Sequence, residues 1–173
     1  MRKVLNGSFY NRPVLTVAEE LLGKYLVRQS AGKRLAFLIT EVEGYDGEKD
    51  LACHARRGKT KRTAVMYGEA GHWYVYLCYG MYWMLNIVTG PVGYPAAVLI
   101  RGVSSHGGPG KLTRELKIGK SFNSKKAAPE KGLWIEDRGV RVMPEKILKT
   151  ARVGISYAGP LWSKKKWRFV LKM

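Results

Sequence analysis

The chain of 173 residues has the length of one domain that can bury a hydrophobic core of its own. Its 31 Lys and Arg residues outnumber its 13 Asp and Glu residues, which gives a formal net charge of +18 at pH 7. That excess predicts attraction to a polyanion, most simply nucleic acid, and the sequence shows no basic amphipathic helix that would favour a membrane surface instead.

The N-terminal residues and the cysteines indicate the compartment. Residues 1–7 lack the apolar run of a signal peptide. The two cysteines, Cys53 and Cys78, form no CxxC motif and no plausible disulfide framework. We therefore expect an intracellular protein, cytoplasmic and associated with the nucleoid or else nuclear, and not a secreted one.

The first predicted elements are a short helix and two strands. Thr16 and Glu19 have the spacing of a capping box, and Gly23 predicts the end of the helix. Residues 24–29 and 34–43 are typical of strands, and the turn-like residues 30–33 join them.

The second strand carries two carboxylates. Strict alternation predicts that one face presents, in order, Leu35, Phe37, Ile39, Glu41 and Glu43. Two interpretations are open for the acidic pair. The strand can simply reach the surface there, or it can hold a carboxylate in a partly desolvated site where its pKa is tuned for acid–base chemistry.

The next residues, 44–72, are rich in glycine and predict loop and short irregular structure. They include a dense cationic cluster at 56–62. Such a cluster is usually a solvated face, so alone it indicates only contact with a polyanion.

Residues 73–88 predict a β-hairpin. They hold six aromatic side chains between Trp73 and Trp83, no charge, and a single glycine, Gly80, near the middle. A turn is normally polar, yet this one presents Tyr79 and Met81. The stretch can be a core hairpin, or an apolar wedge that parts stacked bases within a cationic surface. Residues 73–100 are uncharged over a membrane-spanning length, but glycines and prolines interrupt them, which favours three strands.

The remaining elements are shorter. Residues 96–100 predict a buried strand that ends at Arg101, residues 111–116 a short helix, and residues 133–136 and 167–171 two more strands. We find no internal repeat and no long linker, so residues 1–173 are expected to form a single domain.

Several polar and aromatic residues are candidates for chemistry: Glu43, Tyr45, His54, Tyr76, Tyr79, Asn86 and Arg101. Each also has a structural explanation. A hairpin tyrosine can belong to the core, Asn86 can be a satisfied buried amide, and Arg101 can be a strand-end charge. His54 follows Cys53 but lacks further ligands at zinc spacing, so no metal is expected.

These residues stand in segments whose order and spacing form a specific pattern. The segments are TEVEGY (40–45), CH (53–54), VMYG (65–68), GHWYVYLCYGMY (71–82), LN (85–86), AVLIR (97–101), GPGKL (108–112) and RVGI (152–155). Together they resemble the alkyladenine (3-methyladenine) DNA glycosylase family, the compact type that bears a hairpin. The resemblance runs from about residue 9 to the C-terminus.

The resemblance implies an α+β fold, with a curved antiparallel β-sheet, surrounding helices and a protruding β-hairpin. It also implies base excision repair, in which an alkylated or deaminated purine is flipped out of duplex DNA and released by hydrolysis. Glu43 matches the catalytic carboxylate that activates water, and Arg101 the arginine that helps to hold that water and contacts the phosphate backbone.

The remaining matched residues would hold the base and the DNA. Tyr45, His54 and Tyr76 match the rings that stack on the flipped base, and such rings favour electron-poor alkylpurines. Asn86 matches the residue that excludes the 2-amino group of guanine. Tyr79 and Met81 match the hairpin tip that enters the DNA. The expected contacts to the DNA backbone are Arg56, Arg57, Lys59, Arg62 and Lys111.

The resemblance implies a monofunctional, monomeric enzyme that needs no cofactor. No matched position supplies a lysine that could attack the sugar, so lyase activity is not expected. The partner is double-stranded DNA that contains damaged purines, such as 3-methyladenine, hypoxanthine or ethenoadenine. In the basic loop, Lys61 and Thr63 stand where the family more often has proline and asparagine.

The alternative function is that of a non-enzymatic basic module that binds nucleic acid. This alternative leaves Glu43 and Asn86 unexplained.

Overall fold

An antiparallel sheet of ten strands, counted over the residues 2–172 that the computed structural model describes, organises the fold. The strands are β1 (Lys3–Val4), β2 (Tyr25–Ser30), β3 (Lys33–Asp46), β4 (Trp73–Cys78), β5 (Tyr82–Thr89), β6 (Ala96–Val103), β7 (His106–Gly107), β8 (Leu133–Asp137), β9 (Ile147–Thr150) and β10 (Arg168–Leu171). The helices are α1 (Gly7–Tyr10), α2 (Val14–Leu21), α3 (Pro109–Glu115) and α4 (Gly159–Ser163). This confirms the predicted α+β class and its sheet.

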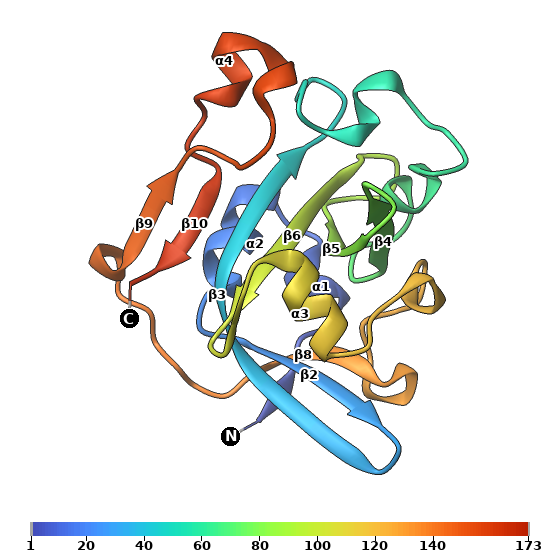
Figure 1. Ribbon diagram of the computed structural model, residues 1–173, viewed down its shortest axis with the longest axis vertical. Helices are drawn as coiled ribbons and strands as arrows, with labels where there is room; N and C mark the ends of the chain where they lie inside the picture. The colour runs from blue at the N-terminus through green and yellow to red at the C-terminus, as the bar shows by residue number, and fades with distance from the viewer. Residues whose placement is uncertain (1, 173) are drawn as a thin grey trace.

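The long strand β3 lies in the middle of the sheet, whose main strand order is β1-β8-β2-β3-β6-β5-β4. It joins the strands β1, β8 and β2 to the strands β6, β5 and β4. Its first half pairs with β2, and its second half lies between β6 and β10. Figure 1 shows β3 through the middle of the molecule, with β9 and β10 on one side and the β4–β5 hairpin on the other. Every residue between Glu41 and Glu43 is thus paired on both edges, which holds this segment rigidly.

The pairing of β3 with β6 contains two irregularities that reorient the carboxylates. Thr40 is an extra residue on β3, and Arg101 is an extra residue on β6. Ile39 and Val42 consequently both face the hydrophobic core, although they are three residues apart. Glu41 and Glu43 therefore lie on the face opposite to Ile39, and the prediction that they continue its face is wrong. The bulge instead sets both carboxylates beside Arg101.

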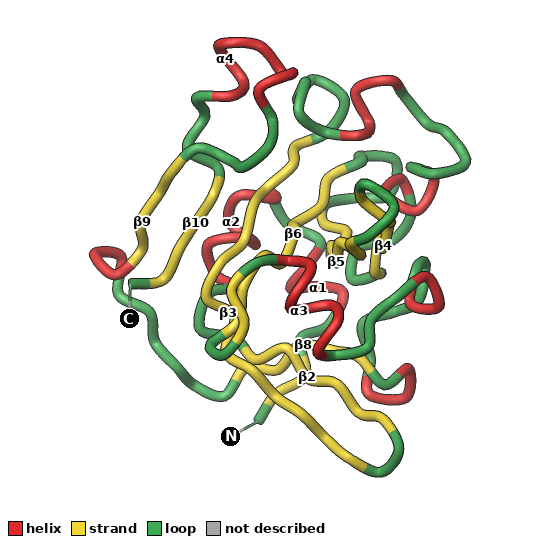
Figure 2. Tube along the Cα trace, in the orientation of Figure 1, coloured by secondary structure: helices red, strands yellow, loops and turns green. Residues whose placement is uncertain are grey.

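Different parts of the chain pack against the two faces of the sheet. One face carries Trp73, Ile87 and Val98, which belong to the main core together with residues of α2 and α3. The neighbouring residues in sequence, such as Tyr74 and Ala97, point the other way because side chains alternate along a strand. Residues 47–72 are mostly loop and short helical turns, which Figure 2 draws in green and red. Cys53, Ala55 and Met66 of this segment pack against that second face. The candidate site forms in the layer between this covering segment and the sheet.

The predicted hairpin is confirmed as β4 and β5, which pair from Trp73 opposite Ile87 to Cys78 opposite Tyr82. The β-branched and aromatic residues of both strands favour this pleated arrangement. Tyr79 and Gly80 form the turn, and both have positive φ, +51° and +66°. This is the combination that a tight two-residue hairpin turn requires, and glycine adopts it without strain.

Other predictions need correction. The helix α2 begins at Val14, after Pro13, so Thr16 lies inside the helix and caps nothing. Proline sets a backbone angle suited to a helix start, and it overrides the capping-box pattern here. Strand β9 was not predicted, because its exposed residues belong to a sheet edge and show no apolar alternation. Within residues 2–172, no helix combines the length and apolar character that a membrane crossing needs.

Candidate active site

Glu43 sits in the part of β3 that is paired on both edges, and its side chain is fully buried. Both carboxylate oxygens have defined partners. The backbone N–H of Val153 donates to Oε1 at 2.7 Å, and the hydroxyl of Tyr45 donates to Oε2 at 2.8 Å. Arg101 Nε lies 3.5 Å from Oε1. These contacts fix the orientation of the carboxylate.

Burial raises the pKa of Glu43 above that of an ordinary glutamate. Arg101, the N–H of Val153, the hydroxyl of Tyr45 and Arg152 oppose that shift by favouring the charged form. Burial also raises the pKa of Tyr45, and the adjacent Glu43 raises it further, so the Tyr45 hydroxyl keeps its proton and remains a donor. The result is a carboxylate that is more basic than usual and held in place.

Arg101 connects Glu43 to a second carboxylate. Its Nε donates to Oε1 of Glu41 at 2.8 Å, and Nε of Arg168 donates to the same oxygen at 2.7 Å. Glu41 therefore orients Arg101 next to Glu43. Nothing in the sequence assigned a role to Glu41 or Arg168, although Glu41 stood out as the neighbour of Glu43 on the strand.

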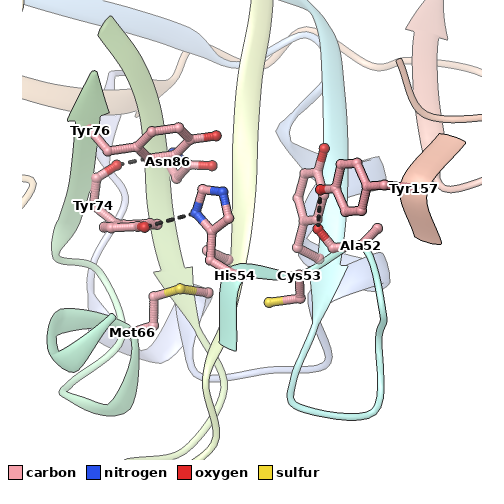
Figure 3. A pocket seen from close by; sticks show the side chains of 10 residues that line it. Ala52, Cys53, His54, Met66, Tyr74, Tyr76, Asn86 and Tyr157 are labelled. Atoms are coloured by element: carbon pink, nitrogen blue, oxygen red, sulfur yellow. Dashed lines mark hydrogen bonds between the residues drawn. The ribbon is translucent and has the colours of Figure 1, made fainter. Parts of the chain in front are cut away.

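A pocket opens on the same face of the sheet as Glu43. Its lining consists of ten residues: Tyr45, Ala52, Cys53, His54, Met66, Tyr74, Tyr76, Asn86, Ala97 and Tyr157. Figure 3 shows His54 with Tyr74, Tyr76 and Asn86 on one side and with Ala52 and Tyr157 on the other. The structure thus brings together all four residues predicted for a base pocket. Glu43 is not among the lining residues, and Tyr45 links it to the pocket through the 2.8 Å hydrogen bond.

Aromatic rings meet closely in one wall of the pocket. The rings of His54 and Tyr76 have centroids 4.7 Å apart, and those of Tyr74 and Tyr76 are 5.1 Å apart. His54 Nδ1 and the hydroxyl of Tyr74 are 2.9 Å apart. Burial lowers the pKa of His54 to about 4, and Arg62 and Arg56 lower it as well. His54 is therefore neutral at physiological pH.

Asn86 is held in the hairpin strand β5. Its side-chain NH₂ group donates to the carbonyl of Tyr74 at 3.1 Å, and the residue is almost fully buried. It lines the pocket while one end of its amide is engaged by the neighbouring strand. A side chain anchored in this way presents a fixed shape to a ligand.

Two further residues that the sequence did not single out support the pocket. Arg152 and Asp50 form a fully buried pair with two contacts, Nη1 to Oδ2 at 2.5 Å and Nη2 to Oδ1 at 2.9 Å. Arg152 Nη1 also donates to the carbonyl of Gly44 at 2.9 Å, and its guanidinium lies 4.7 Å from the centre of the Tyr45 ring. The pair ties the loop after β3 to the segment that carries Val153. Arg152 lies in the quoted RVGI segment, which was the only signal for it.

The hairpin tip lies outside the pocket. Tyr79 is 85% exposed and Met81 is 67% exposed, and neither lines the pocket. Their exposure agrees with the predicted apolar tip, while their expected contact with DNA stays a prediction.

The basic residues proposed for DNA contact fall into two groups. Arg56, Arg57 and Arg62 line a groove that His54 and Tyr157 share with the pocket. Lys59 and Lys111 lie apart from that groove, with Lys59 near the ring of Tyr67 and Lys111 exposed on α3. The three arginines therefore lie in a groove beside the pocket. No group of three His, Cys, Asp or Glu residues within 2–172 is arranged to hold a metal ion.

Comparisons with known proteins agree with this geometry. The chain matches the family model described as methylpurine-DNA glycosylase (MPG) over residues 8–107 and 105–173. It is 45% identical over 186 residues to a protein of Methanocella arvoryzae, a match that covers 96% of this chain and 91% of that protein.

Two further relatives give similar figures. A protein of Sodalis glossinidius is 45% identical over 173 residues, with 96% and 95% covered, and one of Anaeromyxobacter sp. is 42% identical over 175 residues, with 97% and 89% covered. All three relatives are provisionally named 3-methyladenine DNA glycosylase. Because the matches extend over nearly the whole chain, the protein belongs to the methylpurine-DNA glycosylase (MPG) family and is a DNA glycosylase of base excision repair.

Proposed function

We propose that residues 1–173 act as a single DNA glycosylase domain that flips an alkylated or deaminated purine out of duplex DNA and hydrolyses its N-glycosidic bond. The products are the free base and an abasic site. The observation that carries this proposal is the hydrogen bond between Tyr45, in the wall of an aromatic pocket, and the buried carboxylate of Glu43. It connects a binding site for a flat ring to a group suited to acid–base chemistry.

Glu43 would deprotonate the water that attacks C1′ and stabilise the positive charge that develops on the sugar. Its raised pKa supports the first role, because a stronger base accepts a proton more readily. Its fixed orientation between Val153 and Tyr45 supports both roles. Arg101, which Glu41 holds in place, would help to hold the water and would contact a phosphate of the DNA backbone.

The pocket would bind the flipped purine by stacking. Tyr45 would lie against one face of the base, and His54 with Tyr76 against the other. Asn86, whose amide the hairpin backbone holds in place, would exclude the 2-amino group of guanine. A normal guanine would therefore be rejected, while 3-methyladenine, hypoxanthine and ethenoadenine lack that group and fit.

The hairpin tip and the basic residues would act on the rest of the duplex. Tyr79, with Met81 beside it, would fill the space that the flipped base leaves, as apolar wedges do between stacked bases. Arg56, Arg57, Lys59, Arg62 and Lys111 would neutralise backbone phosphates. Each of the three arginines lines the groove beside the pocket, which supports contact near the flipped nucleotide.

Water is the proposed nucleophile, and the reaction would therefore be monofunctional. Among the described residues that line the pocket or contact Glu43, none is a lysine that could form a Schiff base with the sugar.

The test is base release from a duplex with one hypoxanthine or one ethenoadenine, followed by alkali cleavage at the abasic site. We expect strand cleavage with the wild-type protein. Loss of a general base typically costs about 10²–10⁴-fold in rate, so Glu43→Gln should release almost no base. DNA binding by the variant, measured in parallel, should persist because Glu43 is buried. Absence of cleavage by wild type on these lesions and on methylated DNA would leave a basic duplex-binding protein and contradict the proposal.

A further inference from the structure

Three aromatic rings of the pocket each lie against an arginine. The guanidinium of Arg152 is 4.7 Å from the centre of the Tyr45 ring, and that of Arg62 is 4.8 Å from the centre of the Tyr76 ring. Arg56 is 4.7 Å from the ring of Tyr157. A cation over an aromatic ring draws on the negative potential of its face. These rings are therefore less able to attract a second cation than free tyrosines would be.

The positive charges around the pocket are unequally balanced. Arg152 is paired with Asp50, and Arg101 and Arg168 share Glu41, with Glu43 also near Arg101. By contrast, no carboxylate within residues 2–172 forms an ion pair with Arg62 or Arg56. The side chain of Arg56 donates to the carbonyl of Leu51, a neutral partner. Arg57, which lines the same groove, has no such ion pair within residues 2–172 either, so three uncompensated positive charges remain beside the pocket.

The pKa of His54 indicates whether the pocket favours or disfavours a positively charged ring. His54 lies against Tyr76 and lines both the pocket and the groove that holds Arg56 and Arg62. Burial is the first cause that lowers its pKa to about 4, and Arg62 and Arg56 are the next. Burial and the two arginines thus both disfavour positive charge on a flat ring at this place, and a purine stacked on His54 would lie close to the same two arginines.

Purine lesions divide by charge. Methylation at N3 or N7 gives a purine in DNA a formal positive charge, whereas hypoxanthine and ethenoadenine are neutral. We propose that Arg62, placed over Tyr76, biases the pocket toward neutral lesions and against cationic ones. The inference rests on the proposed base-binding function of the pocket and specifies its preferred class of substrate. It also opposes the simple expectation that electron-rich rings favour alkylated, cationic bases, because two of those rings already face an arginine.

The experiment compares one neutral and one cationic lesion of adenine, ethenoadenine and 3-methyladenine, in otherwise identical duplexes. Neither base has a 2-amino group, so exclusion by Asn86 acts equally on both. Single-turnover rates of base release, corrected for spontaneous loss, are measured for wild type, Arg62→Gln, Arg62→Lys and Lys61→Gln. The quantity compared is the rate on the cationic lesion divided by the rate on the neutral one. The intrinsic lability of the cationic glycosidic bond cancels when this ratio is compared between variants.

Lys61→Gln is the matched control, because Lys61 is an exposed neighbour in the same loop and its loss removes the same charge. We expect Arg62→Gln to raise the ratio by about fivefold or more, the order that one charge produces at ring-stacking distance in a partly screened site. Arg62→Lys keeps the charge, and Lys61→Gln leaves Arg62 in place, so both should stay within about twofold of wild type.

The contrary outcomes are distinct. An unchanged or lower ratio in an active Arg62→Gln protein would overturn the inference and leave the glycosylase function intact. An equal rise in Lys61→Gln would also overturn it, because net charge rather than the placement of Arg62 would then set the preference. Release of neither base by wild type would overturn the proposed function itself, and the inference with it.

Discussion

The pocket and the hairpin tip are neighbours along β4 and β5, yet they are built on opposite principles. In the pocket, Asn86 is buried and hydrogen-bonded to a fixed partner, and so is Glu43, which Tyr45 links to the pocket. At the tip, Tyr79 and Met81 expose most of their apolar surface. A pocket of this kind is organised before any ligand arrives, whereas the tip can bury its side chains only against a partner. Under the proposed function, the difference separates residues that would serve chemistry from residues that would serve access to the base.

The tip also carries backbone strain that the pocket lacks. Tyr79 has a φ of +51°, in the left-handed region that a side chain with a Cβ adopts at a cost of about 1–2 kcal/mol. Asparagine would fit the same turn far better. An aromatic ring at a strained and exposed position is consistent with a role in contact rather than in stability.

The largest effect on stability should come from the framework behind the pocket. Asp50→Asn leaves the buried Arg152 without its carboxylate, which typically costs about 3–5 kcal/mol. Chemical denaturation with wild type as reference would measure the loss. Glu48→Gln is the control, because Glu48 is an exposed carboxylate in the same loop whose visible contact is with the hydroxyl of Tyr67. If Asp50→Asn destabilises no more than Glu48→Gln, the pocket does not depend on the buried pair.

A smaller effect, of the opposite sign, is expected for Glu43, the proposed catalytic carboxylate. The pKa of Glu43 is raised in the folded state, so that state binds its proton more tightly than the unfolded chain does. Stability is therefore greatest at acid pH with respect to this group, and it is lost as pH rises through the raised pKa. At neutral pH, where the unfolded chain carries an ionised Glu43, the burial of this carboxyl group is a cost that Glu43→Gln removes.

We expect the Tm of Glu43→Gln at neutral pH to exceed that of wild type by about 2–4 °C, the shift that roughly 1 kcal/mol produces in a domain of this size. Thermal unfolding at several pH values would show the difference shrinking as the pH falls from the raised pKa of Glu43 toward the ordinary glutamate pKa of about 4.3. A variant that is less stable than wild type at neutral pH would show that the hydrogen bonds of the carboxylate outweigh its burial.

The smallest effect on stability should lie at the tip. Tyr79→Asn relieves the left-handed strain of the turn and removes no buried contact, so it should stabilise the protein by about 0.5–1 kcal/mol. Equilibrium denaturation would detect the gain. Destabilisation by Tyr79→Asn would show that the ring supports the hairpin, and the contrast with the pocket would then disappear.

The sequence predicted the hairpin and most of the sheet well, because local features determine them. Gly80 between two aromatic and β-branched runs is sufficient for a hairpin with Tyr79 at its turn. Four pocket residues could be chosen together only through the family resemblance, since Tyr45, His54, Tyr76 and Asn86 come from four separate segments. Their convergence depends on how the sheet pairs and how residues 47–72 cover it.

The features that the sequence did not reveal are those set by tertiary pairing. The bulge at Thr40 and Arg101 arises from the register between β3 and β6, and it reverses the face on which Glu41 and Glu43 lie. Asp50 and Arg152 are 102 positions apart, and each alone is an ordinary charged residue. Local alternation and spacing contain no information about either arrangement.

The division between pocket and tip is tested most directly by the substrate dependence of Tyr79→Asn. Single-turnover release of hypoxanthine would be measured from a paired duplex and from a single strand, with wild type alongside. If the tip serves only to open the duplex, the variant should lose activity on the paired lesion by about tenfold or more and keep its activity on the unpaired one. A loss of this order is what unstacking energies of a few kcal/mol allow. Equal losses on both substrates would place Tyr79 in the chemical step and contradict the account.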